Sequence, residues 1–160
     1  MMPLGRTAPD FALKGIDDEI HNLADYERFK VLVIIFMCNH CPYVQKIWDD
    51  LVVLANSFPN DVQFIGINSN PAYPEDSFEK MKTYAHEKGQ NFPYLFDENQ
   101  KVAKSYGAEC TPDFFMYDLS RKLQYRGGFD GLGLAINSSL NDNIPSMDQK
   151  PSMGCSIKWV

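Results

Sequence analysis

The sequence has no long apolar segment. Its longest uninterrupted apolar run covers residues 31–37, whereas a helix that crosses a bilayer needs about 20 such residues. Residues 1–7 also lack the apolar stretch of a secretory signal peptide. We therefore expect no membrane span and predict a cytoplasmic location.

Positive charge is also scarce. The chain has 15 Lys and Arg against 21 Asp and Glu, which gives a formal net charge of -6. Proteins that bind nucleic acid need clustered Lys and Arg to neutralise phosphates and release counterions. The charge balance therefore argues against a nucleic-acid partner.

Cysteine is sparse and unevenly spaced. The 4 cysteines are too few for the disulfide framework of a secreted scaffold. In a compartment that keeps thiols reduced, such residues are more often catalytic or metal-binding. The four are Cys38, Cys41, Cys110 and Cys155.

The remaining composition is that of an ordinary globular protein. Hydrophobic residues make up 44% and charged residues 22% of the chain, which suits a domain whose core needs no disulfide. We predict a single domain over residues 1–160, with its core at 8–128 and an irregular C-terminal tail at 129–160.

Apolar patterns predict alternating strands and helices. The run 31–37 is typical of a strand buried on both faces, and apolar residues over 44–58 follow the spacing of one helical face. Such alternation favours a three-layer α/β fold with a central mixed sheet flanked by helices. The patterns further predict a short extended pair over 8–23, strands at 62–67 and 93–96, helices at 76–89, 97–107 and 132–140, and a hairpin over 114–126.

Two cysteines stand at the predicted junction of the first buried strand and the following helix. If Cys38 caps the helix, unpaired backbone N–H groups and the positive end of the helix dipole favour its thiolate. Cys41, one turn further on, is within disulfide distance and more shielded. Pro42 suits the first turn, where N–H groups have no helical acceptor. The pattern predicts an exposed attacking thiol at Cys38 and a buried resolving thiol at Cys41.

His40 lies between the two cysteines. A partly charged imidazole there stabilises the Cys38 thiolate, and a stabilised reduced form makes the disulfide more oxidising. We expect a reduction potential above about -270 mV, the value for thioredoxin. In the alternative, His40 is an exposed spacer with no tuning role.

The dithiol and a distant Thr-Pro pair resemble a known superfamily. Cys-Asn-His-Cys at 38–41 follows a buried strand, and Thr111-Pro112 precedes another, an arrangement similar to that of the thioredoxin-like superfamily. The layout of 8–128 resembles its peroxiredoxin-like and membrane-anchored thiol-reductase branch. The ending 154–159 is similar to one peroxiredoxin-like group within that branch.

This resemblance implies a thioredoxin-like fold with an N-terminal β extension. It also implies a cis bond before Pro112, although only about 5–6% of X-Pro bonds in folded proteins are cis. The same resemblance makes Thr111 the residue whose backbone pairs with an incoming substrate strand.

The peroxiredoxin pattern is matched only in part. Peroxiredoxins resemble this chain at Cys41-Pro42, where their peroxide-attacking cysteine precedes a proline. Three residues earlier they have Thr or Ser, whereas this chain has Cys38, and their thiolate-holding arginine would fall near Pro112. A thiol peroxidase with Cys41 as the attacking residue is therefore an alternative function.

The thioredoxin pattern is also incomplete. The aromatic residue that usually precedes the first cysteine is replaced by Met37, and the buried acid that relays a proton would fall at Leu32. His40 and Asp113 are the candidates for this relay, and Asp113 is equally suited to a turn ahead of its strand.

Two further thiols are candidates for the site. Cys110 precedes Pro112 by two residues and is a candidate member of a three-thiol relay; in the alternative it is a small hydrophobic residue. Cys155 can act as a resolving thiol if the tail folds over the site. Otherwise the tail merely docks through Ile157 and Trp159.

Metal binding is a further alternative. Cys38, His40 and Cys41 offer soft ligands for Cu(I) or Zn, as in the copper chaperones that share the thioredoxin fold. Those proteins use a wider cysteine spacing and a distant histidine, for which His21 and His86 are poor candidates.

The sequence thus predicts a thiol-disulfide oxidoreductase. Cys38 attacks a disulfide, a mixed disulfide forms, and Cys41 resolves it. No organic cofactor is required. The expected partners are a protein or small-molecule disulfide as substrate and a thiol reductant or reductase.

Overall fold

A computed structural model describes residues 4–145 and 149–160 and contains two sheets. The strands are β1 (Ala12–Gly15), β2 (Ile20–Asn22), β3 (Val31–Phe36), β4 (Val62–Asn68), β5 (Tyr94–Phe96), β6 (Cys110–Thr111), β7 (Asp113–Tyr117), β8 (Leu123–Gly127) and β9 (Cys155–Ser156). The helices are α1 (Pro42–Asn56), α2 (Phe78–Glu87), α3 (Lys101–Tyr106) and α4 (Leu132–Leu140), with 3-10 turns η1 (Leu23–Tyr26) and η2 (Pro74–Asp76).

The larger sheet is mixed and has seven strands in the order β2-β1-β5-β4-β3-β7-β8. Strand β4 runs parallel to both β3 and β5, while β7 is antiparallel to β3 and to β8. The β7 and β8 strands form the predicted hairpin. At the other edge, β1 pairs antiparallel with β2 and β5, which gives the expected N-terminal β extension.

Strand β3 lies in the middle of this sheet, and all six of its residues are fully buried. Alternate side chains enter two separate cores: Val33 packs in the same cluster as Trp48, and Ile34 in the same cluster as Tyr106. A strand covered on both faces has no polar side to present, which explains its uninterrupted apolar run.

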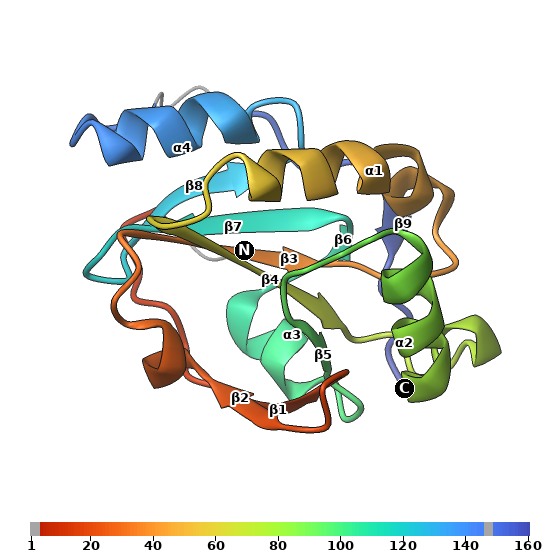
Figure 1. Ribbon diagram of the computed structural model, residues 1–160. Helices are drawn as coiled ribbons and strands as arrows, with labels where there is room; N and C mark the ends of the chain where they lie inside the picture. The colour runs from red at the N-terminus through yellow and green to blue at the C-terminus, as the bar shows by residue number, and fades with distance from the viewer. Residues whose placement is uncertain (1–3, 146–148) are drawn as a thin grey trace.

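Helices cover both faces of the sheet. Helices α1 and α4 lie on one face and α3 on the other (Figure 1). Trp48 of α1, Met81 of α2 and Ile136 of α4 belong to the first core, while Phe11 and the α3 residue Tyr106 belong to the second. The predicted three-layer thioredoxin-like arrangement is confirmed.

The carboxyl ends of the parallel strands position the site. The backbone N–H of Met37 donates to the carbonyl of Ile67 at 2.9 Å, so the chain after β3 continues alongside the end of β4. The 38–41 stretch and the loop after β4 therefore share one edge of the sheet, as the sequence predicts. This is where α/β folds place their ligands.

The start of α2 differs from the prediction. Ser77, and not Asp76, is the N-cap residue, and its side chain accepts the N–H of Lys80 at 3.2 Å. Either residue type can cap a helix. The Asp76 carboxylate is left for contacts elsewhere.

The segment 129–160 contains regular structure. It includes the predicted helix α4 and the short strand β9, which pairs with β6 in the second sheet. Residues 146–148 lie outside the described part of the chain. Among the helices that the structure describes, none is long and apolar enough to cross a membrane.

Candidate active site

The 38–41 stretch leads from β3 into α1. Cys41, with φ -73 and ψ 123, is the N-cap residue, and Pro42 occupies the first turn. The N–H of Val44 donates to the Cys41 carbonyl at 3.1 Å. The prediction that Cys38 caps the helix is wrong, and the positive end of the helix dipole acts on Cys41 instead.

Both thiols of this stretch are buried. Cys38 and Cys41 each have 0% of their surface exposed, so the prediction of an exposed Cys38 is wrong. The Cys38 Sγ lies 3.4 Å from Thr111 Oγ1, and the Cys41 Sγ lies 3.4 Å from the Thr111 carbonyl oxygen. The bond from Thr111 to Pro112 is cis, as predicted, and Thr111 brings a loop from far along the chain to both sulfurs.

The two thiols have opposite acidities. The pKa of Cys41 lies well below its usual value, chiefly because its sulfur accepts a hydrogen bond from Cys38, with a further contribution from the neighbouring Cys155. The pKa of Cys38 is raised because it holds the proton of that same hydrogen bond and is buried. Negative charge therefore settles on Cys41 while Cys38 stays protonated.

His40 pairs with a buried acid. Its Nδ1 contacts the carboxylate of Asp76, which has no exposed surface, and its ring stacks on Tyr73 with 4.0 Å between centroids. His40 is therefore a half-buried, paired residue and not an exposed spacer. Its effect on the thiols stays a prediction.

Asp76 also holds the loop between the cysteines. Its Oδ1 accepts the backbone N–H of Asn39 at 2.6 Å and the side-chain amide of Asn68 at 3.1 Å. The buried hydroxyl of Tyr94 donates to Asn39 Oδ1 at 2.9 Å. This polar network fixes the backbone at the dithiol.

Sequence reasoning missed Asp76 and Tyr94 as site residues. The sequence predicts a helix that starts at Asp76, and the signal against that start was the adjacent Ser77, a residue type that caps helices equally well and is the N-cap of α2. Tyr94 stands in a short apolar strand, and no pattern in the sequence predicts that its hydroxyl reaches Asn39.

Asp113, a candidate for the proton relay, pairs instead with Arg126 and Ser152. Its Oδ2 accepts from Arg126 Nη2 at 2.9 Å, and its Oδ1 accepts from Ser152 Oγ at 2.8 Å. The buried carboxylate therefore ties β7 to β8 and to the C-terminal segment. These contacts favour a structural role.

Cys110 is half-buried next to the cis bond. Its Sγ lies 4.0 Å from the Pro112 carbonyl oxygen, and burial, with the charge of Asp113, raises its pKa to about 12. A thiol with so high a pKa is a poor nucleophile at neutral pH. These surroundings favour the alternative in which Cys110 is a small hydrophobic residue over the one in which it belongs to a three-thiol relay.

Cys155 lies at the dithiol. In β9 it pairs with Thr111, and its Sγ is 2.9 Å from the Sγ of Cys41. Of the two apolar residues expected to dock the tail, Ile157 is buried and Trp159 is 44% exposed. The C-terminal segment therefore folds over the site and brings a third sulfur to it.

One group of side chains in the described ranges has the composition of a metal site. Ligand atoms of Cys38, His40 and Asp76 lie within 4.8 Å of one another, and thiol, imidazole and carboxylate suit Zn. The Asp76 oxygens, however, already accept from His40, from the backbone of Asn39 and from Asn68. These bonds favour a hydrogen-bonded network over metal coordination.

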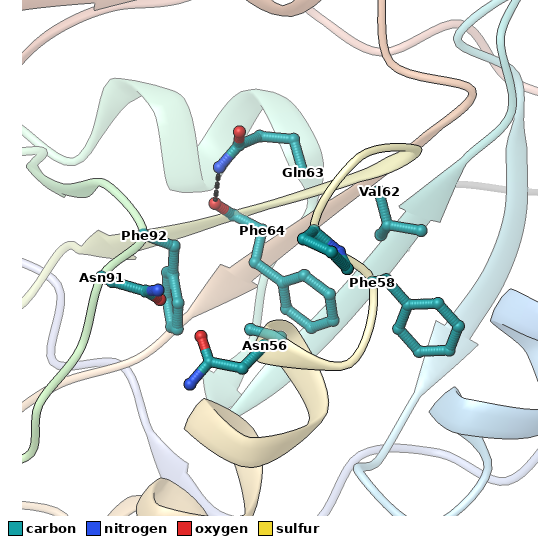
Figure 2. Close-up of a pocket in the computed structure, with 9 residues that line it drawn as sticks. Asn56, Phe58, Val62, Gln63, Phe64, Asn91 and Phe92 are labelled. Carbon is teal, nitrogen blue, oxygen red and sulfur yellow. Dashed lines mark hydrogen bonds between the residues drawn. The ribbon is translucent and has the colours of Figure 1, made fainter.

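A hollow of about 350 Å³ lies at the C-terminal end of α1. Asn56, Phe58, Phe64 and Phe92 line it, as Figure 2 shows. Its distance from Cys41 is about 20 Å, the length of a helix of 15 residues. The hollow is therefore separate from the thiol site.

Comparison with known proteins places this chain among thioredoxin-like folds. The sequence profile of the AhpC/TSA family matches residues 4–126. A curated relative, the thiol-disulfide oxidoreductase ResA of Geobacillus thermodenitrificans, is 27% identical over 124 residues, which cover 76% of this chain and 67% of the relative. The chain thus spans about two thirds of the length of that protein.

Two solved structures match the whole chain. An uncharacterized conserved protein from Geobacillus kaustophilus has 45% identity and a TM-score of 0.97, with 100% of this chain and 94% of that chain covered. A hypothetical protein from Sinorhizobium meliloti has 36% identity and a TM-score of 0.98, with 100% and 96% covered.

Proposed function

This chain belongs to the AhpC/TSA family, and from that premise we propose that it is a thiol-disulfide oxidoreductase whose attacking group is the Cys41 thiolate. The position of Cys41 at the N-cap of α1 carries this proposal, because a helix start favours negative charge. The lowered pKa of Cys41, with the Cys38 thiol as its hydrogen-bond donor, agrees with it. The thiolate is the nucleophile in disulfide exchange.

The exchange proceeds in two steps. The Cys41 thiolate attacks one sulfur of a substrate disulfide, which forms a mixed disulfide and releases the other sulfur as a thiolate. Cys38 then no longer donates to a charged neighbour, so its pKa falls and its proton passes to the departing thiolate. Its sulfur attacks Cys41, forms the Cys38–Cys41 disulfide and releases the second substrate sulfur as a thiolate, so that two electrons reach the substrate.

These roles are the reverse of those predicted from the sequence. The hydrogen bond from Cys38 and the start of α1, and not the order of the cysteines, decide which sulfur carries the charge. Cys41 sits at the N-cap of α1, where backbone N–H groups lack helical acceptors, and Cys38 precedes the helix. Neither residue is exposed.

The reaction requires no organic cofactor. Electrons come from a thiol reductant or a partner reductase, and the substrate is a protein or small-molecule disulfide. Both sides of the exchange use the same two sulfurs, so the direction of electron flow depends on the potential of the partner. We retain the cytoplasm as the predicted location.

Two serine variants test the assignment. Cys41→Ser should abolish reduction of a disulfide substrate. Cys38→Ser combined with Cys155→Ser, which removes the sulfur 2.9 Å from Cys41, should still attack and then accumulate a covalent mixed disulfide, visible by non-reducing electrophoresis and mass spectrometry. The opposite pattern would assign the attack to Cys38. Full activity in both variants would overturn the oxidoreductase proposal.

A thiol peroxidase is the second candidate, and the stabilised Cys41 thiolate ahead of Pro42 favours it. In that reaction the thiolate attacks a peroxide oxygen, gives Cys41 sulfenic acid and releases an alcohol or water. Cys38 stands where peroxiredoxins have Thr or Ser and keeps its proton as a donor. Measured consumption of hydrogen peroxide by the reduced protein, compared with Cys41→Ser, decides this alternative.

A further inference from the structure

Strand β6 has its free edge occupied by a segment of its own chain. Cys110 pairs with Ser156 and Thr111 pairs with Cys155 in an antiparallel ladder. Figure 1 shows β9 alongside β6, close to the start of α1. An exposed strand edge is a general docking site for extended polypeptide segments, and here that position is filled.

The fit between β9 and this edge depends on a glycine. A Cβ on Gly154 would lie 1.9 Å from the Thr111 carbonyl oxygen and 3.2 Å from the Pro112 nitrogen. Any side chain at this position would force the two backbones apart. The residue before Cys155 thus lets β9 approach the cis peptide closely.

The segment is held on both sides of Cys155. On one side, Ser152 Oγ lies 2.6 Å from the Gly127 carbonyl oxygen and 2.8 Å from Asp113 Oδ1. On the other, the buried Ile157 donates its N–H to the Glu109 carbonyl at 3.1 Å. These contacts hold Cys155 in register with Thr111.

We propose that β9 occupies the position of a substrate strand. It covers the site and places Cys155 next to Cys41 as an internal disulfide partner. This inference rests on the proposed thiol-disulfide exchange and names its substrate class. A substrate that replaces β9 is an extended polypeptide segment with a cysteine opposite Thr111 and a small residue before it.

The internal exchange conserves atoms and electrons. Glutathione disulfide first oxidises the site: the Cys41 thiolate takes one glutathione into a mixed disulfide and releases the other as a thiolate. The Cys155 sulfur then attacks Cys41, its proton goes to the departing glutathione, and a Cys41–Cys155 disulfide remains. Cys38 can later attack Cys41, which moves the disulfide inward and restores the Cys155 thiol.

The surroundings of Cys155 make this reaction conditional on oxidation of Cys41. Burial and the neighbouring Cys41 thiolate raise the pKa of Cys155 to about 11. Once Cys41 is in a mixed disulfide, its charge and its hydrogen bond no longer act on Cys155, and that part of the shift disappears. The third thiol is therefore a better nucleophile once a disulfide is present to attack.

Disulfide mapping tests the internal exchange. In Cys38→Ala, one equivalent of glutathione disulfide should produce a Cys41–Cys155 bond, detected by mass spectrometry of non-reduced peptides. The Cys110→Ser change added to this variant should leave the bond unaffected, because Cys110 faces the Pro112 carbonyl instead. A stable glutathione adduct on Cys41 beside a free Cys155 would overturn the inference.

A glycine variant tests the closure with all four cysteines in place. Gly154→Ala should loosen β9 and increase the rate of Cys41 alkylation by about 5- to 150-fold, the range expected for an overpacked position. Gly128→Ala is the matched control, since its Cβ meets nothing within 4 Å. An unchanged alkylation rate in Gly154→Ala would overturn the closure.

Failure of the inference can be told apart from failure of the proposed function. A glutathione adduct on Cys41 without the Cys155 bond retains thiol-disulfide exchange and rejects only the internal partner. No reaction of Cys41 with glutathione disulfide, even in Gly154→Ala, would reject the exchange itself.

Discussion

At the scale of single residues, Cys38 and Cys41 show how one hydrogen bond divides two identical side chains. Both sulfurs are buried, which disfavours a charge on either. A single proton shared between them, together with the N–H groups at the start of α1, concentrates the charge on Cys41. The difference in reactivity between the two thiols therefore arises from their hydrogen bond and from the position of Cys41 at the start of the helix.

Removing the proton donor should shift the titration of Cys41. We expect Cys38→Ala to raise the pKa of Cys41, because the hydrogen bond from Cys38 is the largest cause of its low value. The measurement is the ultraviolet absorbance of the thiolate as a function of pH.

Cys110→Ser is the control for that titration. The pKa values of Cys110 and Cys155, about 12 and about 11, leave Cys41 as the group that titrates below neutral pH. Identical curves for Cys38→Ala and Cys110→Ser would contradict the assignment of the charge.

Asp76 is the second residue on which the structure of the site depends. Its buried carboxylate accepts from the backbone of Asn39, from Asn68 and from His40. We expect Asp76→Asn to lower the free energy of unfolding by about 2–3 kcal/mol, since hydrogen bonds to a charged group contribute about 1.5–3 kcal/mol each and the amide replaces them only in part. Urea unfolding of the reduced protein measures this change.

Asp17→Asn offers a matched comparison. Asp17 also pairs with a histidine, His21, but its side chain is 53% exposed. Exposed ion pairs contribute about 0–1 kcal/mol. Equal losses in the two variants would show that burial of Asp76 does not matter.

At the scale of elements, two strands of two residues each close the thiol site. Such a short ladder has little stability of its own, so β9 depends on side chains beyond it. Ile157 is buried in the core that also contains Phe11 and Tyr106. The anchoring of β9 therefore lies in the body of the fold.

Truncating this anchor should open β9 locally. We expect Ile157→Ala to lower the opening free energy of β9 by about 2–5 kcal/mol, the range for removing a buried Ile side chain. Hydrogen exchange of the Cys155 and Ser156 amides measures it. Ile144→Ala is the control, because Ile144 is 81% exposed, and slow exchange in both variants would refute the anchor.

At the scale of the whole molecule, stability should depend on the redox state. A Cys38–Cys41 bond closes a four-residue loop worth about 2 kcal/mol. Lowering the pKa of a thiol by one unit stabilises its thiolate by about 1.36 kcal/mol, and the pKa of Cys41 in the reduced fold lies well below its usual value. We expect the reduced protein to be the more stable form at pH 7.5. Denaturant unfolding of both forms tests this, and equal or reversed stabilities would contradict it.

The ionisation of Cys41 also determines how the stability of the reduced protein depends on pH. The pKa of Cys41 is lowered in the folded state, so its contribution is complete above the unfolded value of about 8.5 and is lost as the pH falls toward the folded value. Cys38, with a raised pKa, is protonated in both states below about pH 8.5 and adds no slope there. The stability advantage of the reduced form should therefore shrink on acidification, and an advantage that grows would refute the assignment.

The sequence predicts the body of the fold because periodic patterns are local. The apolar run that becomes β3 and the helical stripe of α1 follow from burial on two faces and on one. The approach of Cys155 to Cys41 across 114 positions has no such local signature, because two short strands decide it. The assignment of Asp76 failed for a related reason: two adjacent residues could cap α2, and packing chose between them.

The long separation between Cys41 and Cys155 also has a consequence during synthesis. Ribosomes add about 5–20 residues per second, so the 114 positions between these cysteines take roughly 6–23 seconds to translate. Throughout that interval the nascent chain carries Cys38 and Cys41 without the strand that later covers them. The redox conditions around the ribosome therefore act on the dithiol first, and the cover arrives on a site whose oxidation state has already been set.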